Sequence, residues 1–244
     1  MSITNWLRKI IGITDLSDLV KVNNRILNEI NWANIFNNTI DGCEWLQMKN
    51  FSPGRWAVGY PMLYLLFRLL NEIKPNKILE FGLGESSVML YRYAEFHKDS
   101  RVITFEHDVN WINHFKNRNR IPENASIQLI ENIHLAYKNH QTLGIKNIEN
   151  KLKGETFELI IVDAPFGSPN YSRIQILDLV PNNIDRSNFC IVIDDYNRIG
   201  EKETCIELQE VFNTNGIRFN KGVYYGLKDS VVYCSDNYKY FVSL

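Results

Sequence analysis

Two short runs of consecutive apolar residues constrain the fold of this chain most strongly. They are Leu159-Ile160-Ile161-Val162 and Phe189-Cys190-Ile191-Val192-Ile193. A strand with one face in solvent alternates apolar and polar residues, so uninterrupted runs indicate strands covered on both faces. Strands of that kind are typical of parallel sheets flanked by helices. The two runs therefore predict an α/β fold.

The rest of the sequence beyond Pro75 alternates strand-like and helical segments. Further strand-like runs lie at residues 77–81, 102–105 and 127–130, and helical stretches lie at residues 86–96 and 201–215. Residues 218–242 are rich in aromatic and β-branched side chains with a turn near Lys228, which predicts an antiparallel hairpin. We expect a Rossmann-like, doubly wound, mostly parallel sheet of seven strands, with this hairpin at its edge.

The N-terminal part of the chain has a helical pattern instead. Apolar residues recur at helical spacing between Leu16 and Phe36, which predicts one amphipathic helix or a helix pair; they are Leu16, Leu19, Val20, Ile26, Leu27, Ile30 and Ile35. A second helix is expected at residues 57–73, before Pro75. We divide the chain into an N-terminal helical extension, residues 1–55, and an α/β domain, residues 56–244.

Charge and cysteine content exclude several classes of protein. The chain has 27 Lys and Arg against 28 Asp and Glu, whereas nucleic-acid binders usually carry a basic excess. Residues 5–13 are too poor in apolar side chains for a signal peptide or membrane span, and a short amphipathic turn on a membrane surface is the alternative to a helix packed on the domain. Four scattered cysteines without a CxxC pair favour reduced thiols and a cytoplasmic location.

The turn after the first predicted strand favours a ligand without phosphates. It contains Gly82 and Gly84, but Ser87 occupies the third glycine position of a dinucleotide-binding motif, and Glu85 lies where a pyrophosphate would bind. Glu106 follows the second strand, 24 residues after Gly82, near the spacing of an acidic residue that binds ribose hydroxyls. A nucleoside with a cationic tail, such as S-adenosylmethionine, fits both features. The alternative is that Glu80 and Glu106 are two solvated carboxylates.

This segment resembles the class I S-adenosylmethionine-dependent methyltransferases. Their first motif, acidic-x-Gly-x-Gly, is present as Glu80-Phe81-Gly82-Leu83-Gly84, with Ser86 where many members have a further glycine. The resemblance implies that residues 56–244 form a methyltransferase-like domain and that Glu106 holds the ribose. We expect the cofactor contacts to come from Glu80, Gly82, Gly84, Ser86, Glu106, His107 and Asp163.

Acidic residues follow both of the apolar runs. Asp163 follows the first, and Asp194 and Asp195 follow the second. Because adjacent strands lie about 4.8 Å apart, these three carboxylates are expected to converge and either repel one another or share a hard cation such as Mg²⁺ or Mn²⁺. The pattern resembles the metal-dependent O-methyltransferases of catechols and caffeoyl-CoA, although Asp195 stands where those enzymes have Asn. The alternative is a structural turn at these aspartates.

A second resemblance concerns the acceptor. Phe81-Gly82-Leu83-Gly84, Val162-Asp163-Ala164-Pro165 and Tyr171-Ser172-Arg173 are similar to motifs of the plant glucuronoxylan 4-O-methyltransferase and related polysaccharide-biosynthesis proteins. Ser172 stands where those proteins have glycine. The resemblance implies a saccharide acceptor.

The sequence therefore predicts a methyltransferase that modifies the hydroxyl of a saccharide or another small molecule. Asp163 is the expected base or metal ligand, and Arg173 its catalytic partner, unless Arg173 only pairs with a carboxylate. The acceptor pocket is expected between the N-terminal helices and the loop at residues 166–173. Two alternatives remain: an NAD-dependent nucleotide-sugar enzyme, and a non-catalytic methyltransferase-like protein of surface-polysaccharide biosynthesis. The sequence leaves the oligomeric state open.

Overall fold

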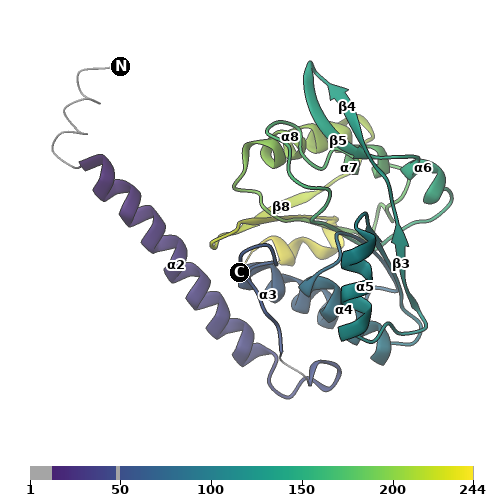
Figure 1. Ribbon diagram of the computed structural model, residues 1–244, viewed down its shortest axis with the longest axis horizontal. Helices are drawn as coiled ribbons and strands as arrows, with labels where there is room; N and C mark the ends of the chain where they lie inside the picture. The colour runs from purple at the N-terminus through teal and green to yellow at the C-terminus, as the bar shows by residue number, and fades with distance from the viewer. Residues whose placement is uncertain (1–12, 48–49, 244) are drawn as a thin grey trace.

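The computed structural model, which describes residues 13–47 and 50–243, contains the predicted seven-stranded sheet (Figure 1). Its strand order is β3-β2-β1-β6-β7-β9-β8. The first five of these strands are parallel, and β9 runs antiparallel to both β7 and β8. The strands are β1 (Lys77–Phe81), β2 (Arg101–Glu106), β3 (Ala125–Leu129), β6 (Leu159–Val162), β7 (Cys190–Ile193), β8 (Asn220–Tyr224) and β9 (Ser230–Cys234). The fold prediction is confirmed.

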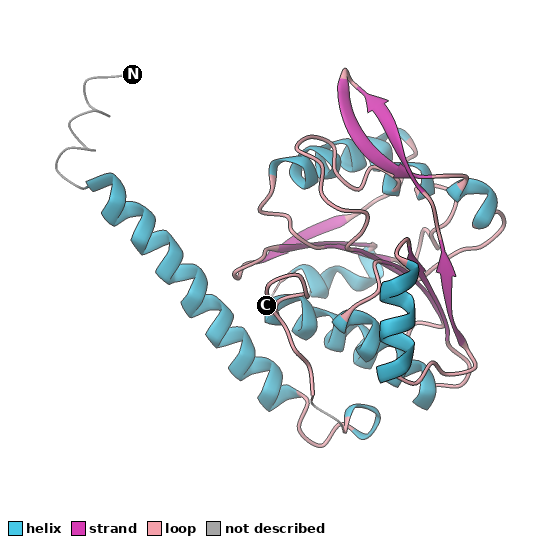
Figure 2. Cartoon of the chain, viewed as in Figure 1, coloured by secondary structure: helices cyan, strands magenta, loops and turns pink. Residues whose placement is uncertain are grey.

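Helices cover both faces of the sheet, and each face has its own apolar core (Figure 2). The two continuous apolar runs became the central strands β6 and β7, whose residues are all buried, as dual coverage requires. The helices are α2 (Ile13–Thr39), α3 (Tyr60–Arg68), α4 (Glu85–Phe96), α5 (Val109–Arg118), α6 (Ile148–Lys151), α7 (Ile176–Leu179) and α8 (Ile199–Thr214), with helical turns η1 (Glu44–Leu46), η2 (Leu69–Ile73) and η3 (Asp236–Val242).

Several predicted boundaries were wrong. The helix expected at residues 57–73 begins at Tyr60, because Pro61 suits a first helical turn, and its last part is the π-helical η2. The C-terminal hairpin ends at Cys234, and residues 236–242 form η3 instead of a strand. A separate hairpin, β4 (Asn132–Tyr137) with β5 (His140–Ile145), was not predicted. Its two-residue turn carries positive φ at Lys138 and Asn139, without the glycine that usually signals such a turn.

The N-terminal extension forms a single helix, which is one of the two predicted alternatives. Residues 16–36 belong to one long helix, α2, and not to a helix pair. The apolar residues that predicted it are 40–62% exposed, while Trp32, Phe36 and Ile40 make the contacts with the core shared by α3. Residues 5–12 of the predicted amphipathic turn lie outside the described residues. Across residues 13–47 and 50–243, no helix is both long and apolar enough to cross a bilayer.

Candidate functional site

The carboxyl ends of β1, β2, β6 and β7 bring most of the predicted site residues to one edge of the sheet. Backbone hydrogen bonds continue past the strand ends and join their loops. The Gly82 N–H donates to the Phe105 carbonyl (2.9 Å), and the Asp163 N–H donates to the Phe81 carbonyl (2.9 Å). The glycine turn therefore lies between the Glu106 loop on one side and the Asp163 loop on the other.

Glu80 lies beneath the glycine turn and is fully buried. Its carboxylate accepts hydrogen bonds from Ser86 Oγ (2.6 Å), Ser87 Oγ (2.7 Å) and Thr104 Oγ1 (2.9 Å). Burial raises the pKa of Glu80 to about 7, although the three hydroxyls act in the opposite direction. Glu80 and Ser86, both predicted as cofactor contacts, are thus placed where they tie the turn and the start of α4 to β2.

Ser87 and Thr104 were missed as members of this network. Ser87 Oγ also accepts the N–H of Gly84 at the start of α4 (2.9 Å), so it caps the helix as well as binding Glu80. The signal available in the sequence was the pair of serines directly after the glycine turn. Thr104 carried no such signal, because only the register of β1 against β2 places it opposite Glu80.

The two glycines of the turn serve different purposes. Gly82 has a φ of +101°, and a Cβ there would lie 3.2 Å from the Cβ of Ala164 and 3.3 Å from the carbonyl carbon of Asp163. Gly84 has an extended φ, and a Cβ there would meet no atom of the described residues within 4 Å. The protein's own backbone therefore requires glycine at position 82, whereas position 84 leaves open space beside the turn.

Glu106 bridges the second strand to the glycine turn. Its Oε2 accepts the N–H of Leu83 (3.1 Å), and its Oε1 accepts the N–H groups of His107 (2.7 Å) and Asp108 (2.9 Å). The Nδ1 of His107 lies 2.8 Å from the same Oε1. The Glu106 carboxylate is thus oriented entirely by neutral backbone groups and this imidazole. Each carboxylate oxygen has about two lone-pair sites, so Oε2 retains capacity for a further donor.

Asp163, Asp194 and Asp195 converge as predicted, with one oxygen of each lying within 4.8 Å of the others. Arg173, which is 2% exposed, lies among them. Its Nη2 binds Asp163 Oδ1 (2.9 Å) and Asp195 Oδ2 (2.7 Å), and its Nη1 donates to the backbone carbonyl of Asp194 (2.7 Å). The guanidinium therefore bridges the loops that follow β6 and β7.

Two further cations and one further acid complete this cluster. Arg198 lies 2.9 Å from Asp195, Lys228 lies 3.7–3.8 Å from Asp195 and Asp194, and the buried Glu201 lies 3.7 Å from Arg173. Four carboxylates thus face three cations. Lys228 carried no signal in the sequence, because it is remote along the chain from the aspartates that it approaches. Arg198 lies three residues after Asp195, and Glu201 three residues after Arg198, a spacing of charges whose meaning was missed. None of the residues 13–47 and 50–243 donates a hydrogen bond to Oδ2 of Asp194, which is buried.

Asp163 is the most exposed of the four carboxylates in the cluster, with 20% of its side chain exposed. Burial raises its pKa to about 7, and the charges of Asp194 and Asp195 add to this effect while Arg173 opposes it. A carboxylate with such a pKa exchanges a proton near neutral pH, which is the property that general base catalysis requires.

Exposed aromatic side chains lie next to these carboxylates. Phe166 is 58% exposed and contacts the rings of Trp56 (6.1 Å between centroids) and His107 (5.4 Å). Trp56 is 84% exposed and is therefore not a core residue, whereas Tyr60 packs against Phe36. A surface hollow of about 460 Å³ adjoins Arg198; it is lined by Gly167, Ser168, Pro169, Arg198, Ile199 and Gly200.

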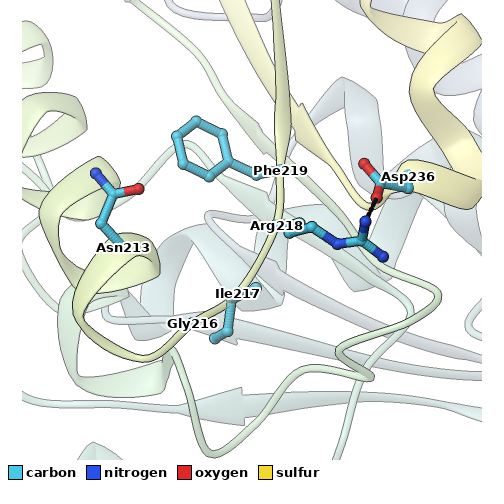
Figure 3. Close-up of a pocket in the computed structure, with 6 residues that line it drawn as sticks. All are labelled: Asn213, Gly216, Ile217, Arg218, Phe219 and Asp236. Atoms are coloured by element: carbon cyan, nitrogen blue, oxygen red, sulfur yellow. Dashed lines mark ion pairs between the residues drawn. The ribbon is translucent and has the colours of Figure 1, made fainter.

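A second hollow, of about 500 Å³, lies at the other edge of the sheet (Figure 3). Arg218 and Asp236 form an ion pair of 3.2 Å across its rim. Asp236 follows the end of β9, which pairs with the start of β7. This hollow is therefore remote from the carboxyl ends of the parallel strands and from the predicted site residues.

Known structures share this architecture at low sequence identity. The O-methyltransferase TomG of Streptomyces achromogenes, involved in tomaymycin synthesis and solved in complex with S-adenosylmethionine, has a TM-score of 0.50 and 12% identity, covering 87% of this chain and 98% of its own. A Staphylococcus aureus protein assigned as a caffeoyl-CoA O-methyltransferase has a TM-score of 0.51 and 14% identity, covering 86% of this chain and 100% of its own. A Klebsiella pneumoniae protein assigned as an O-methyltransferase has a TM-score of 0.50 and 13% identity, covering 85% of this chain and 99% of its own.

No protein-family profile and no curated protein matches the sequence. The predicted resemblance to the plant glucuronoxylan enzymes therefore rests on its short motifs alone. The structural likeness establishes the fold: the chain has the Rossmann-like fold of the S-adenosylmethionine-dependent O-methyltransferases.

Proposed function

We propose that this protein is an S-adenosylmethionine-dependent methyltransferase that modifies a hydroxyl group. The observation that carries this proposal is the position of Glu106, whose carboxylate accepts a hydrogen bond from the backbone N–H of Leu83 in the glycine turn. The open space beside Gly84 adjoins that turn, and the Asp163 loop flanks it on the other side. This arrangement supports a nucleoside binding next to a carboxylate with a pKa near neutrality.

The residues fit the cofactor. Those at the glycine turn would bind it, and those around Asp163 would act on the acceptor hydroxyl. Glu106 would accept the ribose hydroxyls, and the backbone at Gly84 would approach the methionine part closely. When bound, S-adenosylmethionine supplies a methyl group on a positively charged sulfur. Asp163 would take the proton of the acceptor hydroxyl as that oxygen attacks the methyl carbon. The bond between the methyl carbon and sulfur would break in the same step, with S-adenosylhomocysteine as the leaving group, and Arg173 would hold the Asp163 carboxylate in place. Positioning of the two reactants provides the main part of such catalysis.

The acceptor is expected to bind over the exposed rings of Phe166 and Trp56. Both rings lie beside the carboxyl ends of the strands, and aromatic faces bind flat apolar surfaces, including those of sugars and phenols. The motifs around Asp163 and Arg173 favour a saccharide among these classes. We expect the reaction to take place in the cytoplasm.

Cofactor binding is tested by calorimetry with S-adenosylmethionine and with NAD⁺. We expect the first ligand alone to bind, and Glu106→Ala to weaken binding at least about tenfold, because hydrogen bonds to a charged acceptor contribute about 1.5–3 kcal/mol each. Glu131→Ala, which removes an exposed carboxylate paired with Lys146, is the matched control. Binding of NAD⁺ alone would favour the nucleotide-sugar enzyme, and an unchanged affinity in Glu106→Ala would refute the ribose assignment.

A divalent cation at Asp163, Asp194 and Asp195 is the second way to neutralise the acidic cluster. The specific observation in its favour is the buried Oδ2 of Asp194, which has Lys228 Nζ at 3.8 Å but receives no hydrogen bond from the described residues. Three close carboxylates suit Mg²⁺ or Mn²⁺. In this role the cation would lower the pKa of the acceptor hydroxyl. The positions of Arg173, Arg198 and Lys228 support the metal-free mechanism instead.

The two mechanisms differ in their response to chelation. Transfer of labelled methyl groups from S-adenosylmethionine to a catechol, a methyl glycoside and a uronic acid would be measured with and without EDTA. We expect activity to persist in EDTA and to be lost in Asp163→Asn. Activity that stops in EDTA and returns with Mg²⁺ would establish the metal mechanism. Binding of S-adenosylmethionine without transfer to any acceptor would favour the non-catalytic alternative.

A further inference from the structure

Helix α2 has an exposed apolar stripe with no partner among the described residues. Leu16, Leu19, Val20, Ile26, Leu27 and Ile30 are 40–62% exposed. With Asn23 included, they recur every three or four residues, as 16, 19 and 20, 23, 26 and 27, and 30, so they lie on one side of the helix. Figure 1 shows the N-terminal half of α2 extending away from the rest of the protein. An isolated helix shorter than about 12–15 residues is only marginally stable in water. The projecting half of this 27-residue helix is of that size. The stripe therefore indicates a surface that another molecule covers.

The opposite face of α2 attaches the helix to the domain. Arg25 binds Asp229 Oδ1 (2.8 Å), Glu29 accepts the N–H of Tyr60 (2.7 Å), and Trp32 donates to the carbonyl of Tyr225 (2.9 Å). Asp18 and Lys21 precede Arg25 by seven and four residues, so they share this face. The charged residues between Leu16 and Thr39 are these alone: Asp18, Lys21, Arg25 and Glu29. The exposed stripe is thus uncharged along its whole length.

This distribution of charge selects the kind of partner. Helices that lie on membranes carry Lys and Arg along the polar face that flanks their apolar stripe, whereas α2 has two basic residues in this region and Arg25 is engaged with Asp229. An uncharged stripe containing one polar residue, Asn23, is instead typical of a seam between two helices. A single polar residue in such a seam specifies its register, because other registers would place it against apolar side chains.

The stripe is also symmetric about Asn23. Leu16 and Ile30 lie seven residues before and after it, Leu19 and Leu27 lie four, and Val20 and Ile26 lie three. Two antiparallel copies that cross at Asn23 would therefore place Leu16 against Ile30, Leu19 against Leu27 and Val20 against Ile26, twice over. Such a surface is self-complementary, as the interface of a two-fold symmetric dimer must be.

We propose that the protein forms a homodimer in which two α2 helices pack antiparallel about a two-fold axis at Asn23. Each domain attaches through the face of α2 opposite the stripe, so the two domains lie on outer sides of the helix pair. This proposal does not depend on the proposed activity, because the stripe lies outside the candidate site.

The dimer is tested by sedimentation and light scattering of the full chain. We expect twice the chain mass of 28.6 kDa. Leu27→Lys should raise the dimer dissociation constant at least about tenfold, since it places a charge in the seam. Ile35→Lys, which alters an exposed apolar residue of the same helix outside the stripe, is the matched control and should remain dimeric.

The antiparallel arrangement has its own test in a double variant. Leu19→Glu combined with Leu27→Lys would place Glu against Lys at two points of an antiparallel pair and should restore the dimer lost in Leu27→Lys. In a parallel pair the same double variant sets Glu against Glu and would stay monomeric, which would refute the two-fold axis at Asn23. A wild-type monomer at all concentrations, or a monomer that binds phosphatidylglycerol vesicles through the stripe, would overturn the proposal as a whole.

Discussion

Two regions at the same edge of the sheet hold buried carboxylates by different means. At the glycine turn, Glu80 and Glu106 accept hydrogen bonds from hydroxyl and backbone N–H groups, and the one ionisable partner in the described part of the chain is His107. At the acidic cluster, the aspartates are satisfied largely by the charges of Arg173, Arg198 and Lys228. Neutral donors orient a carboxylate and leave its negative potential in place, whereas cations cancel it. The first region therefore suits a cationic ligand, and the second suits the exchange of a proton.

Among the predicted effects, the loss of stability on removing the Arg173 guanidinium from the acidic cluster should be the largest. We expect Arg173→Met to destabilise the fold by about 3–5 kcal/mol, the usual cost of leaving buried charges without their partner. Urea denaturation measures the change. Arg198→Met is the matched control and should cost under about 1 kcal/mol, because Arg198 is 48% exposed. Equal losses in the two variants would mean that Arg173 does not hold the cluster together.

At the glycine turn, the comparison predicts a pH effect. The pKa of Glu80 is raised to about 7 in the fold from 4.5, so the folded protein keeps a proton that the unfolded chain releases between these values. Below about pH 4.5, protonated Glu80 makes its full contribution to the free energy of unfolding, up to about 3 kcal/mol. This contribution is lost as the pH rises to about 7.

Glu80→Gln removes that ionisation and reveals its contribution. The difference in unfolding free energy between wild type and Glu80→Gln should therefore shift in favour of the variant as the pH rises from 5 to 8. Urea denaturation at each pH gives this difference, and Glu131→Gln serves as an exposed control. Parallel profiles for wild type and Glu80→Gln would show that Glu80 is ionised throughout.

The smallest expected changes in stability separate the two glycines. Gly82→Ala should cost about 1–3 kcal/mol, because its φ is positive and its surroundings are close-packed. Gly84→Val should leave the thermal midpoint nearly unchanged and abolish binding of S-adenosylmethionine, because its side chain would enter the open space beside the turn. Full binding by Gly84→Val would place the ligand elsewhere.

The parallel core could be predicted because its signal is local. A strand that is covered on both faces has apolar residues at consecutive positions, as Leu159–Val162 does, wherever it lies in the sheet. A glycine turn after a strand indicates the edge of the sheet at which ligands bind in such folds. The hairpin β4–β5 could not be predicted in the same way, because its turn at Lys138 and Asn139 lacks glycine.

The sequence by itself determined the sheet, the glycine turn and the convergence of Asp163 with Asp194 and Asp195, because neighbouring parallel strands end side by side. Only the tertiary structure decided how those charges are balanced and which face of α2 is free. Arg173 and Lys228 reach the aspartates from other loops, whose paths no periodicity encodes, whereas Arg198 pairs locally with Asp195 at the start of α8. The apolar period of α2 predicts a helix but not what covers it, since an apolar stripe packs equally well on its own domain or on a second chain.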